Sequence, residues 1–262
     1  MRGACAVSWV CCLVNGMASR LLKIPALWYS RNVDTRSQHS RVQAITAPTV
    51  ASLIRASCMD EFPTDPRTIR ARIRRYERTL RHEQERFGCM RDGGGTRYLL
   101  GPLYLLLGDT AGALWSFAWF AQTFPDDSGD PVHFLCWTLA LYRTGDLKHA
   151  TVTLRQTMLS NLYLLPRLLG LPQDPIDMWH ASNLAEKAYS DDVPNEVLAL
   201  WEPPALHWAH TVYVRAPMQR VRRRYIAIYH QLQTEPLGPT RYRLVDEAMH
   251  LKYPPRTRAG LA

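Results

Sequence analysis

The 262-residue sequence offers few groups with the type and spacing that catalysis or metal binding requires. His207 and His210 lie three residues apart, a spacing at which two imidazoles on one helix can share a metal ion. No Cys or carboxylate lies at a matching distance along the chain. We therefore predict no metal site and no cofactor, and interpret both histidines as surface or packing residues.

Adjacent carboxylates occur at Asp126-Asp127 and at Asp191-Asp192. A catalytic acid and base face each other across a cleft, whereas neighbouring aspartates in a loop are explained by helix N-capping and hydration. The sequence also contains no nucleophile elbow, HExxH or Walker pattern. These features predict a protein without catalytic residues, so we do not expect an enzyme.

A glycine-rich stretch, "RDGGGTR" at residues 91–97, is the one candidate phosphate cradle. Successive glycines ahead of a helix can present backbone N–H groups to an anion. No Gly-Lys-Ser/Thr follows the stretch, and no strand pattern precedes it. A hinge or capping loop is the simpler interpretation.

The composition is that of an ordered protein with an uneven charge. At 47% hydrophobic and 10% aromatic residues the chain can bury a sizeable core. The net charge of +9 divides into an acidic middle, residues 91–214, and basic flanks. The flanks can be solvated or paired with the middle, or they can bind nucleic acid or an anionic membrane.

The six cysteines form no CxxC pair and no regular disulfide spacing, which favours a reducing compartment and a cytoplasmic protein. Residues 1–17 nevertheless have a short apolar stretch before small residues, as in a signal peptide, and residues 19–41 are basic and contain serine, as in a transit peptide. Export or organelle targeting is therefore the alternative. We expect residues 1–45 to be a leader outside the fold.

The apolar run from Leu99 to Phe120 is long enough to suggest a membrane span. Pro102, Gly108-Asp109 and Gly112 interrupt it, however, and a single helix would have to include all of them. Two shorter helices joined near Gly108 would not have to include these poor helix formers in a helix interior. The sequence predicts a helical hairpin here and no integral membrane span.

The Gly-Asp pair recurs at Gly145-Asp146, 37 residues later, and self-similarity at such a period is typical of helical repeats. The chain resembles the tetratricopeptide repeat (TPR) family over residues 93–172, including bacterial members whose "GxRY" opening is similar to "GTRY" at 95–98. The resemblance implies close helix packing at particular positions. These are Gly101, Tyr104, Gly108, Ala113, Phe117, Pro125, Gly145 and Ala150.

In TPR proteins the first helix of each repeat lines a concave groove that binds partners, so the resemblance implies a groove in this chain. Only one of its lining residues is charged, which disfavours a clamp for a peptide carboxylate and favours an apolar helix or peptide of a protein partner. The implied groove residues are Tyr98, Leu99, Pro102, Leu105, Leu135, Leu139, Tyr142 and Arg143.

Helices are also predicted on both sides of the repeats. Asp65-Pro66 has the residues of a helix start, and the helix it begins has an apolar stripe and an arginine-rich opposite face, with Glu77 and Arg81 spaced to pair. Asp174-Pro175 should begin another helix, and residues 218–232 have the pattern of a helix that lies on other helices. This helix either fills the groove or is itself the element that docks to a partner. The predicted basic face consists of Arg70, Arg74, Arg78, Arg220, Arg223 and Arg224.

The fold class that follows is all-α, a short TPR-like right-handed helical array with irregular flanking and capping helices. Its expected segments are a leader (1–45), a basic helical segment (46–92), the repeats (93–172) and a C-terminal capping segment (173–262). The expected function is a non-catalytic protein–protein interaction scaffold. The alternative is a nucleic-acid-binding protein that uses the arginine-rich helix faces, which would make its affinity depend steeply on salt.

Overall fold

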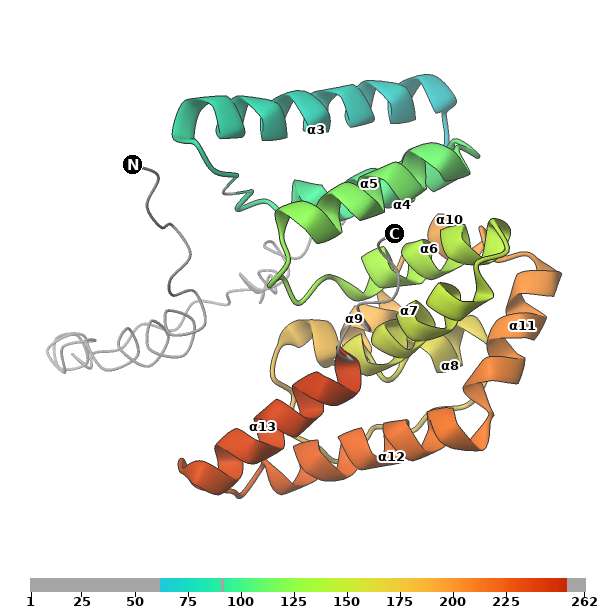
Figure 1. Ribbon diagram of the computed structural model, residues 1–262. Helices are drawn as coiled ribbons and strands as arrows, with labels where there is room; N and C mark the ends of the chain where they lie inside the picture. Colours follow the sequence, from blue (N-terminus) through green and yellow to red (C-terminus); the bar gives the residue numbers. More distant parts are fainter. Residues whose placement is uncertain (1–61, 91, 254–262) are drawn as a thin grey trace, which may run out of the picture. The chain divides into compact units, whose positions relative to one another are not determined.

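Residues 62–90 and 92–253 are described by the computed structural model, and all of their regular secondary structure is helical (Figure 1). The described part excludes the predicted leader (residues 1–45), residues 46–61 and residues 254–262. The helices are α3 (Pro66–Phe87), α4 (Thr96–Leu106), α5 (Thr110–Thr123), α6 (Pro131–Arg143), α7 (Leu147–Ser160), α8 (Leu164–Leu168), α9 (Lys187–Asp191), α10 (Asn195–Leu198), α11 (Pro203–Tyr213), α12 (Ala216–Gln231) and α13 (Pro239–Lys252), with a 3-10 turn, η1 (Asn183–Ala185).

The apolar run divides into α4 and α5, as predicted, and none of the helices described here is long and apolar enough to cross a membrane. Gly108 adopts a left-handed φ of 76° at the turn, and Asp109 caps α5 by accepting a hydrogen bond from Gly112 N at 2.8 Å. Backbone freedom and a capping carboxylate therefore explain why Gly-Asp ends one helix and begins the next.

The turn between α6 and α7 repeats this geometry. Gly145 has a φ of 80°, and Asp146 accepts a hydrogen bond from His149 N at 3.1 Å. The 37-residue sequence period thus corresponds to two helical hairpins with equivalent turns. Helix α4 packs against α3, α5 and α6, and α6 packs against α5 and α7.

Four of the eight positions expected to pack are buried, namely Gly101, Ala113, Phe117 and Ala150, whereas Gly108, Pro125 and Gly145 are exposed in turns between helices. A Cβ atom on Gly101 would lie 2.2 Å from Phe117 Cε1, so only glycine permits this approach of α4 to α5. Phe117, Ala113 and Ala150 are fully buried. The two helices of each hairpin therefore pack closely against each other.

Helix α3 begins and ends as its sequence predicts. Asp65 accepts a hydrogen bond from Thr68 N at 2.8 Å, Pro66 occupies the first turn, and Gly88 terminates the helix with a φ of 67°. The predicted pairing of Glu77 with Arg81 was wrong. Tyr104 on α4 donates a hydrogen bond to Glu77 at 2.6 Å instead, which turns this carboxylate towards the neighbouring helix.

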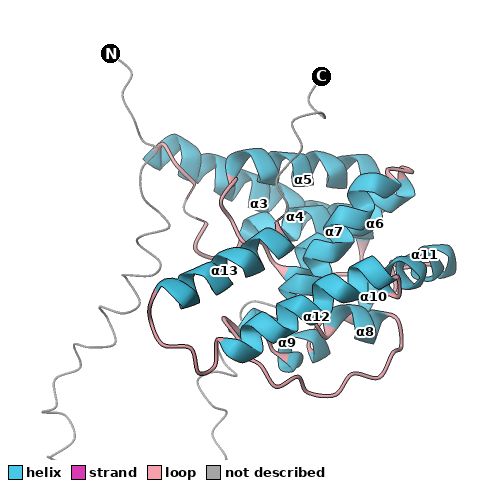
Figure 2. Ribbon diagram, turned by 60° about the horizontal axis from the view of Figure 1, so that its bottom comes forward, coloured by secondary structure: helices cyan, strands magenta, loops and turns pink. Residues whose placement is uncertain are grey.

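The helix expected to start at Asp174-Pro175 does not form, and residues 169–182 are irregular. Their backbone groups find partners on other elements: Ile176 N donates to Tyr163 Oη at 2.8 Å, and Trp179 N donates to the carbonyl oxygen of Tyr229 at 3.0 Å. Tertiary hydrogen bonds thus replace the helical ones, which sequence periodicity alone does not reveal. Helix α12 packs on α7, α11 and α13, and α13 also contacts α7 (Figure 2).

Candidate binding surfaces

The residues implied to line a concave groove are covered by the chain itself. Pro102 is buried, and Leu105, Leu135 and Leu139 are each at most 1% exposed. The other four members of the set, Tyr98, Leu99, Tyr142 and Arg143, are half-buried. An open apolar groove at these positions is therefore a prediction that the structure corrects.

The stretch around α10 and α11 contacts the half-buried end of α6 and packs on α4. Arg143 donates a hydrogen bond to the carbonyl oxygen of Leu200 at 2.9 Å and lies 3.8 Å from the Glu202 carboxylate. The rings of Tyr142 and Trp208 lie 5.0 Å apart, and α10 packs on α4. The apolar first-helix positions therefore belong to the protein's own core.

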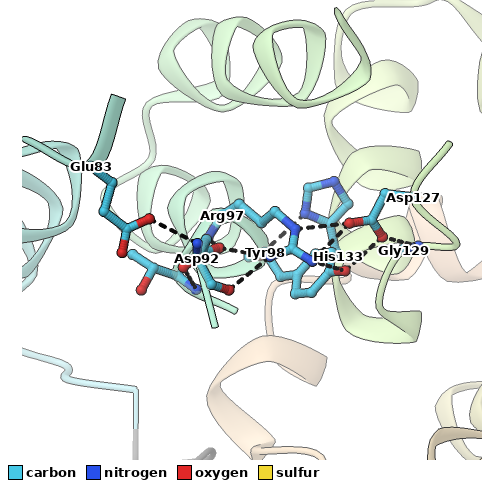
Figure 3. Close-up of polar contacts among 8 residues, drawn as sticks. Glu83, Asp92, Arg97, Tyr98, Asp127, Gly129 and His133 are labelled. Atoms are coloured by element: carbon cyan, nitrogen blue, oxygen red, sulfur yellow. Dashed lines mark hydrogen bonds and ion pairs between the residues drawn. The ribbon is translucent and has the colours of Figure 1, made fainter. Parts of the chain in front are cut away.

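A polar network joins the loop before α4 to the loop between α5 and α6 (Figure 3). Arg97 donates to the carboxylate of Asp92 at 3.0 Å and to that of Asp127 at 2.8 Å. Tyr98 Oη donates to Asp127 at 2.6 Å, and burial together with this bond raises the pKa of Tyr98 above its usual value. Glu83 of α3 accepts a hydrogen bond from Asp92 N at 2.8 Å, so the network ties α3 to both loops.

His133 lies at the edge of this network and is completely buried. Its Nδ1 is 3.2 Å from the carbonyl oxygen of Tyr98, and rings of Phe117 and Phe120 pack against its imidazole with centroids 4.9 and 4.4 Å away. Burial lowers the pKa of His133 to about 4, so the ring is neutral at physiological pH. An Nδ1–H tautomer satisfies the carbonyl.

Asp130 is half-buried and caps the start of α6. It accepts hydrogen bonds from Val132 N at 2.8 Å and His133 N at 3.1 Å, and a third from Tyr189 Oη at 2.7 Å. Burial raises its pKa. The signal that identifies Asp130 is the Pro131 that follows it, which repeats the Asp-Pro helix start of α3.

These polar groups stabilise the fold. Asp127 accepts a hydrogen bond from Tyr98, and Asp130 accepts one from Tyr189, so each carboxylate joins its loop to a neighbouring helix. Within residues 62–90 and 92–253 there is also no group of three or more His, Cys, Asp or Glu that could hold a metal ion. His207 and His210 are both exposed.

Helix α3 carries a row of exposed arginines. Seven of its arginines are exposed, and five of these are spaced three or four residues apart, which places them on one helix face. No ion pair with a carboxylate of the described chain is formed by any of the five. We call this set the arginine row: Arg67, Arg70, Arg74, Arg78 and Arg81.

The opposite face of α3 is anchored by Ile69, Ile73 and Leu80, which are at most 4% exposed. The helix therefore holds the arginine row outward on a fixed support. Shallow depressions run along it, one lined by Arg74, Arg78 and Arg81 with Glu77. The structure thus brings together Arg70, Arg74 and Arg78 of the predicted basic face.

The other half of the predicted basic face, on α12, is separate. Arg224 is committed to α13, where it donates two hydrogen bonds of 2.6 Å to Glu247. Arg220 and Arg223 remain exposed. Because α3 and α12 lie on opposite sides of the α4–α7 helices in Figure 1, the two arginine sets do not form one surface.

Comparison of the chain with family models, curated proteins and solved structures gives no match. Its function must be argued from its own residues.

Proposed function

We propose that this chain is a non-catalytic, TPR-like binding scaffold that recognises an anionic partner through the arginine row. The TPR-like part of the proposal is supported by the two hairpins with matching Gly-Asp turns and by the packing of α4 on α6. Helix α3 then takes the position of the second helix of a preceding repeat, and the C-terminal helices cap the right-handed array.

The observation that carries the proposal is the absence of carboxylate partners for five aligned arginines within the described chain. Helix α3 also contains three glutamates that could neutralise them. Glu77 bonds to Tyr104 and Glu83 bonds to Asp92 N, and the exposed Glu85 forms no ion pair with the row within the described chain. The positive charge of the row is left for a partner.

The concave side has a different role in this proposal. Leu105, Leu135 and Leu139 are buried in the protein's own core, so they stabilise the fold and do not meet a partner. This replaces the apolar groove implied by the TPR resemblance with a charged outer surface. We propose that the protein acts in a reducing compartment, the cytoplasm, where the thiols of Cys89 and Cys136 stay reduced.

Retention on heparin-agarose tests the proposal, because heparin is a polyanion without a peptide or a base. The test variant is Arg70→Glu with Arg74→Glu, and the control is Arg220→Glu with Arg223→Glu, which changes the net charge equally on the opposite side. We expect the row variant to elute at clearly lower salt than both the wild type and the control. Equal elution of the two variants would show that only net charge matters and would refute the proposal.

A further inference from the structure

We infer that the partner of the arginine row is a nucleic acid, contacted through its phosphate backbone without reading of base sequence. This inference rests on the proposed function and names the class of its ligand.

The length and spacing of the row suit a phosphate backbone. Arg67 and Arg81 are separated by fourteen residues of continuous α-helix, which at about 1.5 Å per residue makes a row of about 21 Å. Duplex DNA carries one negative charge per about 1.7 Å of its axis, so a row of this length lies beside a stretch that carries about twelve phosphate charges on its two strands. Five long, flexible side chains can therefore each reach a phosphate on the facing side of the duplex.

The chemistry of the row also suits phosphate. All eight basic residues of α3 are arginines, and the helix contains no lysine. A guanidinium group donates two parallel hydrogen bonds to a phosphate, is only weakly hydrated and stays charged at any physiological pH. The row thus combines permanent charge with directional donors.

An acidic protein partner would require an apolar centre that the row does not have. Protein–protein interfaces bury an apolar core inside a polar rim, whereas protein–nucleic acid interfaces are more polar and much more positive. Between Arg67 and Arg81 every large apolar side chain of α3 is turned towards α4, and the exposed large one, Phe87, lies at the helix end. The row face therefore offers charge without an apolar anchor.

The way in which α3 packs on α4 favours contact with phosphates over contact with bases. Ile69, Ile73 and Leu80 hold the inner face of the helix against α4, so only the outer strip of the helix is free to meet a ligand. The long charged side chains on that strip are mostly arginines, and contacts of arginine with phosphate fix position on the backbone but do not by themselves distinguish sequences. We expect similar affinity for unrelated sequences.

The test uses the full chain with fluorescein-labelled 20-base-pair DNA duplexes of two unrelated sequences, and poly-L-glutamate as the protein-like polyanion. Affinity is measured by fluorescence anisotropy between 50 and 200 mM salt. If each of the five arginines contacts one phosphate, the slope of log affinity against log salt should be about −4.5 for duplex DNA. Replacing two of them, Arg70→Gln with Arg74→Gln, should make the slope less steep by about 2.

The matched controls are Arg220→Gln with Arg223→Gln, which should leave the slope unchanged, and Arg70→Lys with Arg74→Lys, which keeps the charge and should largely keep the slope. Circular dichroism checks that α3 remains helical in each variant. Poly-L-glutamate bound as tightly as DNA through the row would overturn the nucleic-acid inference and leave the proposed function intact. No binding to either polymer, or equal loss in the α12 control, would overturn both.

Discussion

The imidazole of His133 replaces a hydrogen-bond donor that Pro102 lacks. In α4 the carbonyl oxygen of Tyr98 should accept a hydrogen bond from the N–H of residue 102, but that residue is proline and has no N–H. His133 Nδ1, from the following hairpin, lies 3.2 Å from this oxygen. One hairpin therefore completes the backbone hydrogen bonding of the other.

Replacing His133 should destabilise the protein, because the carbonyl oxygen of Tyr98 then has no hydrogen-bond donor. His133→Phe keeps an aromatic ring in the cavity but leaves the Tyr98 carbonyl without a donor, which should lower the free energy of unfolding by roughly 1–3 kcal/mol. Urea denaturation measures the change. The double variant with Pro102→Ala restores an N–H at residue 102, so the second substitution should rescue stability more in His133→Phe than in the wild type. Strictly additive effects would contradict the relationship.

The same histidine should make stability depend on pH. Its pKa is lowered from 6.5 to about 4 in the folded protein, so its contribution is complete above pH 6.5 and is lost as the pH falls towards 4. The loss for this one group should reach about 3 kcal/mol. The raised pKa of Asp130 acts in the opposite direction, but it is common to the wild type and His133→Phe. The stability gap between these two proteins should therefore narrow on acidification, and a constant gap would exclude the effect.

Gly101 should tolerate no side chain. In Gly101→Ala the added Cβ would lie 2.2 Å from Phe117, so α4 and α5 must move apart, with an expected cost of about 1–3 kcal/mol. An alanine in a helix would otherwise be more stable than glycine by about 1 kcal/mol. Gly93→Ala, where no atom lies within 4 Å, is the matched control. A melting temperature equal to that of the wild type would contradict the close packing of the hairpin.

Leu139 distinguishes a core position from an open groove. Because Leu139 is 1% exposed, Leu139→Asp buries a charge without a partner and should cost at least 3 kcal/mol or prevent folding. Leu147→Asp places the same substitution at a position that is 47% exposed and should be tolerated. Thermal unfolding of both variants decides the matter. A stable Leu139→Asp protein would restore the open groove that the repeat resemblance implies.

Features encoded within a few residues were predictable from the sequence. The start of α3 at Asp65-Pro66 and the turns at Gly108 and Gly145 all depend on local capping and backbone freedom. The predicted helix from Asp174 failed because distant hydrogen-bond partners override the local signal. Periodicity identifies local structure but not which segments meet.

In the candidate site, too, local patterns were predictable from the sequence and long-range contacts were not. The one-sided arginines of α3 were visible as a pattern, and so was the period of the hairpins. The buried roles of Asp130 and His133 were not, because Tyr189 lies 59 residues from the former and Tyr98 lies 35 residues from the latter. The contacts of Tyr142 and Arg143 with Trp208 and Leu200 were not predictable for a related reason, since these partners are more than 50 residues away along the chain.

The contact between Arg143 and Leu200 can form only some seconds after Arg143 has been synthesised on the ribosome. The two residues are 57 positions apart, and at about 5–20 residues per second Arg143 is synthesised roughly 3–11 s before Leu200. Throughout that interval α6 lacks its contacts with α10 and α11. The nascent chain therefore presents an apolar surface to chaperones, and to neighbouring nascent chains, that the finished protein conceals.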